Sequence, residues 1–241
     1  MTQHKNPQGQ PIGAPVPEWT GCAPIPRTPM QGRYCDLVPL DAAHSADLFA
    51  AFDADTTGTL WTYMPVGPFA TAQDYAAWVA TAQHSKDPLF FTIIAKDGRR
   101  PVGVASFLRM DPANGVAEVG FITFAPALQR TPAATEAMYL MMKRAFDLGY
   151  RRYEWKCDAL NAPSRKAAAR LGFSYDGLFR QATVYKGRNR DTAWFSILDK
   201  DWPALDQAFQ LWLAAENFGP DGRQRQRFGD LAPQPNNNPN D

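Results

Sequence analysis

Two sets of polar residues in the middle of the chain have the types and positions that acid–base chemistry needs. Glu118 lies within an apolar, strand-like run from Val116 to Phe124. A carboxylate there must be paired, face a cleft or have a raised pKa, because burying an isolated charge is costly. It is therefore either a general base or one half of an ion pair with a nearby arginine. Asn161 and Ser164 stand at the start of a later helix, where both residue types are also ordinary caps.

A possible anion site follows the same run, because the loop Gln129–Ala134 leads into a helix that Pro132 opens. First-turn amides have no intrahelical partner and the macrodipole is positive there, so phosphate is the expected guest. Proline pre-sets the first turn but has no N–H to donate. The side chains of Gln129 or Arg130 could add donors, and an ordinary Pro-opened helix is the alternative. The expected backbone donors are the amides of Arg130, Thr131, Ala133 and Ala134.

The order of these segments resembles the acetyl-CoA-binding core of the GNAT N-acetyltransferases. It is most similar to the branch that contains the ribosomal-protein acetyltransferases RimJ and RimL. The resemblance runs from about Arg33 to Ala215. The segments that carry it are Ala117–Phe121, Leu128–Ala137, Asn161-x-x-Ser164 closed by Leu171-Gly172-Phe173, Gly177–Arg180, and Gly187–Asp191 followed by Trp194.

The resemblance implies direct transfer of acetyl from acetyl-CoA to a primary amine, without a covalent enzyme intermediate. Glu118 would deprotonate the acceptor ammonium, and the Ser164 hydroxyl would stabilise the departing thiolate. Many members have a tyrosine as general acid seven residues after the asparagine, whereas this chain has Ala168. A backbone N–H near Ile122 to Phe124 would polarise the carbonyl. The cofactor-binding residues implied are Ile122, Phe124, Gln129, Arg130, Thr131, Ala133, Ala134, Thr135, Asn161, Ser164 and Lys166, the last of which a solvated helix face explains as well.

The acceptor side is expected at the loop from Leu60 to Phe69, whose large apolar residues lie among prolines and either fill a core edge or line a pocket. In the resembled branch this region lies over the acceptor site. The acceptor that the resemblance implies is a peptide or protein N-terminus, or a small-molecule amine. The alternative is a non-catalytic acyl-CoA-binding module with a sensor or interaction role, which Pro132 and the absent tyrosine suggest. The expected substrate-pocket residues are Trp61, Tyr63, Met64 and Phe69.

Composition argues against several other classes of protein. The 241 residues include 25 basic and 24 acidic side chains, so no nucleic-acid or membrane partner is expected. The three cysteines show no metal-ligand spacing, so neither a zinc site nor a disulfide framework is predicted. The N-terminus lacks the apolar core of a signal peptide. We therefore expect a cytoplasmic monomer or homodimer that uses no metal.

Hydrophobic periodicity, together with the resemblance, predicts an α/β fold: a mixed, mostly antiparallel, twisted sheet of about seven strands with helices on both faces. Residues 1–30 are expected to form an extended Pro-rich segment, 31–217 a single acetyltransferase domain, and 218–241 a polar, disordered tail. The predicted strands are 33–40, 89–95, 102–110, 116–124, 153–157, 175–185 and 192–198. The predicted helices are 42–53, one that begins at 71, 132–148, one that begins near 161, and 202–216.

Overall fold

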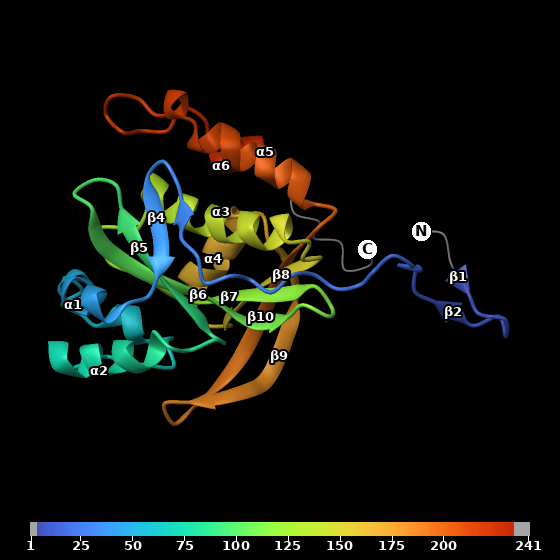
Figure 1. The fold of residues 1–241 in the computed structure, drawn as a ribbon, viewed down its shortest axis with the longest axis horizontal. Helices are drawn as coiled ribbons and strands as arrows, with labels where there is room; N and C mark the ends of the chain where they lie inside the picture. Colours follow the sequence, from blue (N-terminus) through green and yellow to red (C-terminus); the bar gives the residue numbers. More distant parts are fainter. Residues whose placement is uncertain (1–3, 234–241) are drawn as a thin grey trace.

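A sheet of eight strands runs through the centre of the computed structural model, which describes residues 4–233 (Figure 1). The strand order is β3-β4-β5-β6-β7-β8-β10-β9. Strands β7 and β8 are parallel, and the other neighbours are antiparallel. The bounds are β3 (Met30–Gln31), β4 (Cys35–Pro39), β5 (Leu89–Ala95), β6 (Arg100–Asp111), β7 (Val116–Phe124), β8 (Arg152–Asp158), β9 (Ser174–Tyr185) and β10 (Arg188–Leu198).

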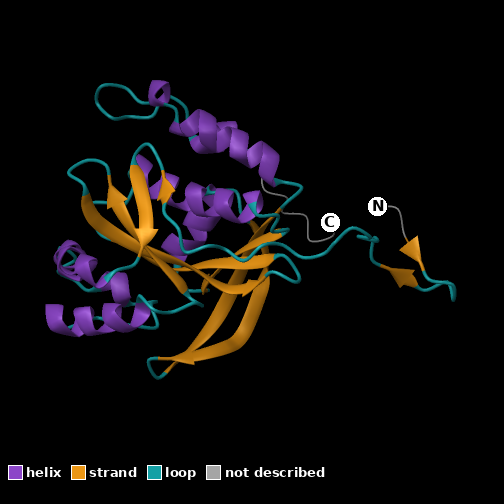
Figure 2. Cartoon of the chain, in the orientation of Figure 1, coloured by secondary structure: helices purple, strands orange, loops and turns teal. Residues whose placement is uncertain are grey.

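Helices cover both faces of this sheet, which confirms the predicted fold class (Figure 2). One face carries α1 (Ser45–Asp53) and α2 (Ala72–Ala82). The opposite face carries α3 (Pro132–Asp147), α4 (Ala162–Arg170) and α5 (Trp202–Leu213). Short 3-10 turns span Ala42–His44, Thr59–Trp61 and Ala215–Asn217, and α6 (Phe228–Leu231) follows. Between residues 4 and 233, no helix is long and apolar enough to span a bilayer.

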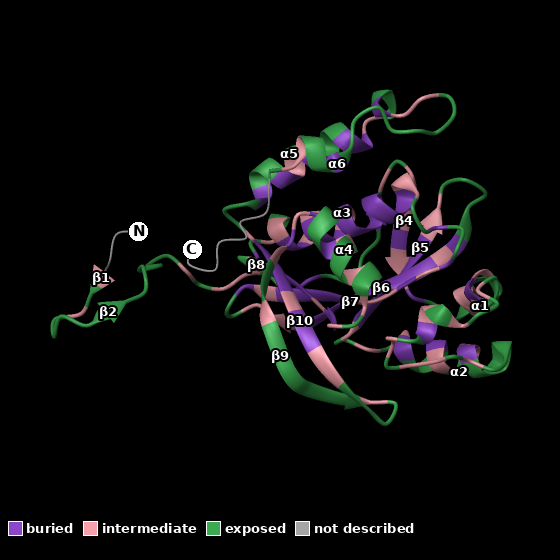
Figure 3. Ribbon diagram, turned by 180° about the vertical axis from the view of Figure 1, so that it is seen from behind, coloured by how far each residue is buried: buried purple, intermediate pink, exposed green. Residues whose placement is uncertain are grey.

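Each face of the sheet has its own apolar core, and the buried residues follow the central strands and α3 (Figure 3). Under α3 and α5, Met141 and Tyr153 are fully buried. Under α1 and α2, Leu48, Phe52 and Tyr75 form the second core. Because the two cores fix both faces of β5, β6 and β7, these strands form a firm base for the site.

Helix caps fix the chain at the two helix starts that matter for the site. Thr131 caps α3 by accepting a hydrogen bond from the Ala134 amide at 3.2 Å. Asn161 caps α4 in the same way, with the Ser164 amide at 3.2 Å. The helix predicted over 42–53 begins instead as a 3-10 turn, Ala42–His44, which Asp41 caps before α1. A side-chain cap costs about 1 kcal/mol to lose, so both site helices begin at defined residues.

Strands β7 and β8 separate halfway along their length. Their pairing runs from Val116 opposite Arg152 to Val119 opposite Trp155 and extends no further. Beyond this point β7 continues to Phe124 and β8 to Asp158. Phe121 has a φ of 50°, in the left-handed region, and the β6–β7 register shifts nearby. The two strands therefore diverge, and each has an open edge beyond this point.

The N-terminal end of the described chain lies outside the main sheet. At the N-terminal end, β1 (His4–Lys5) and β2 (Pro11–Ile12) pair with each other away from the main body (Figure 1). Trp19 fastens this segment, because its indole N–H donates to the Ala113 carbonyl at 2.7 Å. Its ring also lies against the Arg151 guanidinium, 5.2 Å from the ring centroid.

Residues 218–233, which were expected in a disordered tail, instead fold back along α5. Phe228 in α6 is 2% exposed, and its ring centroid lies 4.3 Å from that of Phe209. Phe218 packs edge-on against Trp212 at 5.2 Å. Two widely spaced aromatic residues thus order a segment whose overall composition is polar. The rest of the expected tail, 234–241, lies outside the described residues.

Candidate active site

A cavity of about 1290 Å³ lies where β7 and β8 separate. Its walls come from the end of β7, the first turns of α3 and α4, the loop after α1 and the C-terminal segment. Most of the residues predicted to bind a cofactor meet here, although they come from three separate stretches of sequence. Those that line the cavity are Ile122, Phe124, Gln129, Arg130, Thr131, Ala134, Thr135, Asn161 and Ser164.

Two of the predicted cofactor residues do not line the cavity. The Ala133 side chain is buried in the core under α3, and its carbonyl accepts a hydrogen bond from the Cys35 thiol at 3.4 Å. Lys166 is exposed on α4, as expected for a solvated helix face. The Ala133 backbone can still contribute its amide, because that amide belongs to the first turn of α3.

The loop before α3 has fewer free donors than the sequence suggests. The Thr131 amide donates to the Leu128 carbonyl at 3.3 Å, and the Ala134 amide is used by the cap. Within residues 4–233, the amides of Arg130 and Ala133 have no acceptor outside the helix ladder. The Gln129 side chain donates to the Phe124 carbonyl at 3.0 Å, so it closes the loop instead of pointing freely into the cavity. Arg130, with a φ of 62°, makes the turn into the helix.

The open edge of β7 presents backbone donors. The Ala125 amide donates to the Val102 carbonyl on β6 at 2.9 Å. Successive amides of a strand point to opposite edges, so the amides of Phe124 and Ile122 face the side where β8 has separated. Both residues line the cavity. An oxygen atom bound between the strands would therefore meet preorganised N–H groups.

Ser164 is oriented by a tryptophan on β8. Its hydroxyl oxygen accepts a hydrogen bond from the Trp155 indole N–H at 2.9 Å. Both residues line the cavity, and the Trp155 side chain is otherwise buried. Because the tryptophan occupies one lone pair, the serine proton remains free to donate to a second group. Ser164 can therefore stabilise a negative charge that forms beside it.

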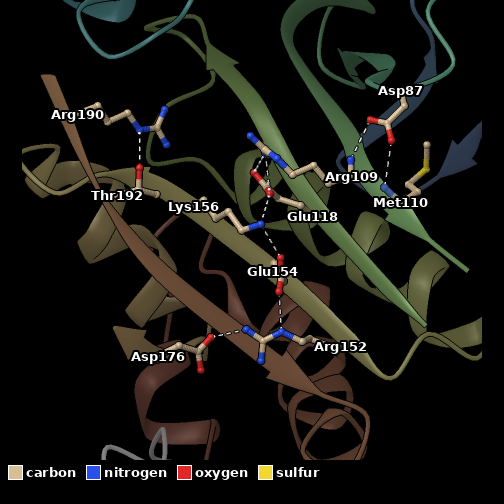
Figure 4. A network of polar contacts seen from close by, with 10 residues as sticks. All are labelled: Asp87, Arg109, Met110, Glu118, Arg152, Glu154, Lys156, Asp176, Arg190 and Thr192. Carbon is tan, nitrogen blue, oxygen red and sulfur yellow. Dashed lines mark hydrogen bonds and ion pairs between the residues drawn. The ribbon is translucent and has the colours of Figure 1, made fainter. Parts of the chain in front are cut away.

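Glu118 lies in a chain of ion pairs (Figure 4). One Arg109 nitrogen is 2.8 Å from each carboxylate oxygen, and the Lys156 ammonium lies 2.9 Å from one of them. The chain continues from Lys156 to Glu154 at 2.7 Å and from there to Arg152 at 2.6 Å. Burial raises the pKa of Glu118, although Lys156 and Arg109 act in the opposite direction.

Glu118 is not among the residues that line the cavity. Its contacts are those of the structural ion pair that the sequence left open as the alternative to a general base. Its side chain is 4% exposed, so a proton could reach it from a substrate only through a water or through a movement of Arg109, whose side chain is 61% exposed. Its role as a base therefore stays a prediction, and the site centres on Ser164 and the loop before α3.

The loop after α1 both fills the core and lines the cavity. Tyr63 and Met64 line the cavity, as expected for an acceptor site. Trp61 and Phe69 pack instead in the core under α2, with ring centroids 5.3 Å apart. The β9–β10 hairpin holds this loop, because the Lys186 ammonium donates to the Trp61 carbonyl at 2.8 Å.

Several cavity residues were not identified from the sequence. Trp155 carries no local signal of its role, since its partner Ser164 lies beyond the end of its own strand. Four arginines also line the cavity, and three of them occupy every second position of one C-terminal stretch. That stretch is visible as a pattern, but only tertiary contacts place it. These arginines are Arg170, Arg223, Arg225 and Arg227.

In the described part of the chain, no group of three or more potential metal ligands occurs.

Comparison with known proteins agrees with this geometry. Residues 36–174 match the family model described as an acetyltransferase (GNAT) domain. The chain is 29% identical over 164 residues to the uncharacterized N-acetyltransferase p20 of Bacillus licheniformis, which covers 62% of this chain and 89% of that protein.

Two solved structures are more similar in sequence. A GCN5-related N-acetyltransferase from Brucella melitensis has 47% identity and a TM-score of 0.88, and the match covers 90% of this chain and 99% of that one. A probable acetyltransferase of the GNAT family from Chromobacterium violaceum has 40% identity and a TM-score of 0.75, over 83% of this chain and all of that one.

Proposed function

The chain belongs to the GNAT acetyltransferase family, and we propose that it transfers an acetyl group from acetyl-CoA to a primary amine by direct attack. The observation that carries the proposal is the cavity between the separated strands β7 and β8, which joins a helix N-terminus to an open strand edge. The first supplies unpaired amides for phosphate, and the second supplies donors for a carbonyl. This combination fits a long, phosphorylated thioester.

The residues of the cavity would hold the cosubstrate in sections. The first turn of α3 would bind the pyrophosphate through the free amides of Arg130 and Ala133 and the positive end of the helix dipole. The open edge of β7 would hold the pantetheine arm by backbone hydrogen bonds. The amides of Ile122 or Phe124 would then stabilise the negative charge that develops on the thioester oxygen.

The reaction needs one protein group at the acceptor amine and another at the thioester sulfur. A neutral amine attacks the thioester carbon, a C–N bond forms, the C–S bond breaks, and the nitrogen releases its second proton to solvent. The acceptor ammonium must lose a proton first, and we assign this step to Glu118, acting through water. The thiolate leaves beside the Ser164 hydroxyl, which would donate a hydrogen bond to the sulfur and relay a proton from solvent. Because one cavity would hold both reactants in position, it would also lower the entropic part of the activation barrier.

The acceptor would enter past Tyr63 and Met64, which line the cavity. A mixed aromatic and apolar wall suits either a peptide N-terminus, as in the RimJ and RimL branch, or a small amine. Because no specific contact favours either acceptor, the RimJ and RimL branch stays a prediction. The cytoplasmic location stays a prediction as well. The alternative of a non-catalytic acyl-CoA-binding module predicts the same cofactor affinity without turnover.

Two measurements test the proposal. Acetyl-CoA or CoA should raise the melting temperature of the protein, because a ligand that binds only the native state stabilises it by mass action. NADH and ATP, at the same concentration, are the controls and should have a much smaller effect. No shift at about 1 mM CoA, well above a micromolar Kd, would contradict the cofactor assignment. Release of free CoA in the presence of a library of amines and peptides would then separate an enzyme from a binding module.

A further inference from the structure

The charged side chains that line the cavity are all positive. Five arginines line it, and among the described residues neither a carboxylate nor a lysine does so. Two of them belong to the acetyltransferase core, where Arg130 precedes α3 and Arg170 ends α4. The other three, Arg223, Arg225 and Arg227, come from the segment after α5, which lies outside the 36–174 match to the family model.

The segment that carries these three arginines, residues 217–228, is held as a closed loop. Asn217 is 7% exposed. Its side chain donates to the Trp212 carbonyl at 2.9 Å and accepts from the Gln226 amide at 2.8 Å. The Asn217 carbonyl accepts from the Arg225 amide at 2.6 Å. Phe228 then anchors the far end of the loop on Phe209. One buried amide group and one buried ring therefore fix where the arginines lie.

The sequence of this loop alternates from Arg223 to Arg227. The glutamines between the arginines are tied to α5 and its end: Gln224 accepts from the Trp212 indole N–H at 2.9 Å, and the Gln226 backbone pairs with Asn217. The arginines are exposed, and among residues 4–233 their one ion-pair partner is Asp221, whose carboxylate lies 3.6 Å from Arg223. Their guanidinium groups thus remain available to a ligand in the cavity.

The wall beside these arginines is aromatic. Trp212 and Phe218 both line the cavity, and they pack edge-on at 5.2 Å. An aromatic wall next to a group of guanidinium ions suits a purine that carries a phosphate, because an aromatic ring can stack on the base and arginines bind the phosphate oxygens in pairs.

We infer that the loop 217–228 binds the 3′-phosphoadenosine end of CoA. The inference rests on the proposed function. The start of α3 offers donors for the pyrophosphate, which leaves the third phosphate of CoA to be recognised. Arg223, Arg225 and Arg227 supply the missing positive charge, and Trp212 with Phe218 supplies the surface for adenine. The loop thereby distinguishes CoA from pantetheine thioesters that lack this phosphate.

The test compares two ligands on three proteins by isothermal titration calorimetry. The ligands are CoA and 3′-dephospho-CoA, and the proteins are wild type, the triple variant Arg223→Gln/Arg225→Gln/Arg227→Gln, and a control that removes three exposed charges away from the cavity, Arg99→Gln/Arg100→Gln/Lys200→Gln. We expect the triple variant to bind CoA roughly tenfold to 100-fold more weakly, as for loss of charge-assisted hydrogen bonds. Its affinity for 3′-dephospho-CoA should change by less than about threefold, and the control should match wild type for both ligands.

The outcomes separate this inference from the proposed function. If wild type binds CoA and the triple variant binds it equally well, the loop is not the phosphate site and the inference is overturned while the proposed function stands. Equal weakening for both ligands would also overturn it, because the arginines would then act on some other part of the cofactor. Failure of wild type to bind CoA would overturn both. Melting curves without ligand show whether the triple variant keeps its fold.

Discussion

Glu118 and Glu154 are register partners on the parallel strands β7 and β8, and the Lys156 ammonium lies between their carboxylates, 2.9 Å from one and 2.7 Å from the other. Like charges at paired positions repel, so the shared lysine makes this arrangement tolerable. The pKa values of the two carboxyl groups nevertheless shift in opposite directions. Burial raises the pKa of Glu118. Burial acts the same way on Glu154, but hydrogen bonds from Arg152 and Lys156 outweigh it and lower the pKa of that carboxyl.

The lowered pKa of Glu154 makes its contribution to stability dependent on pH. Its charge stabilises the fold above the unfolded-state value of about 4.5, and this contribution is lost as pH falls through the lower folded-state pKa. At pH 7, Glu154→Gln should reduce the free energy of unfolding by about 1–3 kcal/mol. The difference from wild type should vanish in acid, as urea unfolding across pH would show. Glu216→Gln, at an exposed position, is the control, and an equal loss at all pH values would contradict the charge as the cause.

Glu118→Gln keeps the shape of the side chain but removes the proposed base. Turnover at neutral pH should fall by about 10²- to 10⁴-fold, and part of the rate should return as pH rises and the amine deprotonates unaided. CoA affinity should stay close to that of wild type. The matched control is Glu154→Gln, which disturbs the same ion pairs without removing the base. A loss that is flat with pH and equal in both variants would make Glu118 a structural charge.

Ser164→Ala removes the hydroxyl next to the position proposed for the sulfur, so the defect should differ in kind. Its rate loss should persist at high pH, because it concerns the leaving group and not the amine. The loss should be larger for thioesters of more basic thiols. Steady-state rates with a series of acetyl thioesters would measure this. Ser164→Thr, which keeps a hydroxyl, is the control, and a loss independent of the thiol would argue that Ser164 acts only through its bond to Trp155.

Pro132→Gly tests the loop before α3. The substitution regains an amide but loosens the first turn, so CoA affinity should change by less than about tenfold, or about 1.4 kcal/mol. Calorimetric titration gives the value directly. A larger gain would mean that the missing N–H limits binding. Complete loss of binding would mean that the phosphates lie elsewhere in the cavity.

The sequence predicts the elements well where periodicity is strong and poorly where single tertiary contacts decide. The apolar, β-rich runs of β5, β6 and β7 and the capped starts of α3 and α4 are local signals, so the elements around the cavity could be located in advance. The environment of Glu118 could not be, because Arg109 and Lys156 reach it from neighbouring strands whose register is set by long-range packing. The arginine loop was missed because its order depends on two buried groups, Asn217 and Phe228, within a polar stretch.

Strand order has a consequence for how the chain reaches this structure during synthesis. Strand β10 lies between β8 and β9, although it follows both in sequence. When the ribosome has made β9, that strand has no neighbour to pair with, and β8 still presents a row of unpaired N–H and C=O groups. The sheet can close only after Leu198 has emerged. A nascent chain that ends near residue 174, where the match to the family model ends, should therefore be prone to aggregate, even though it contains Asn161, Ser164 and the whole of α3.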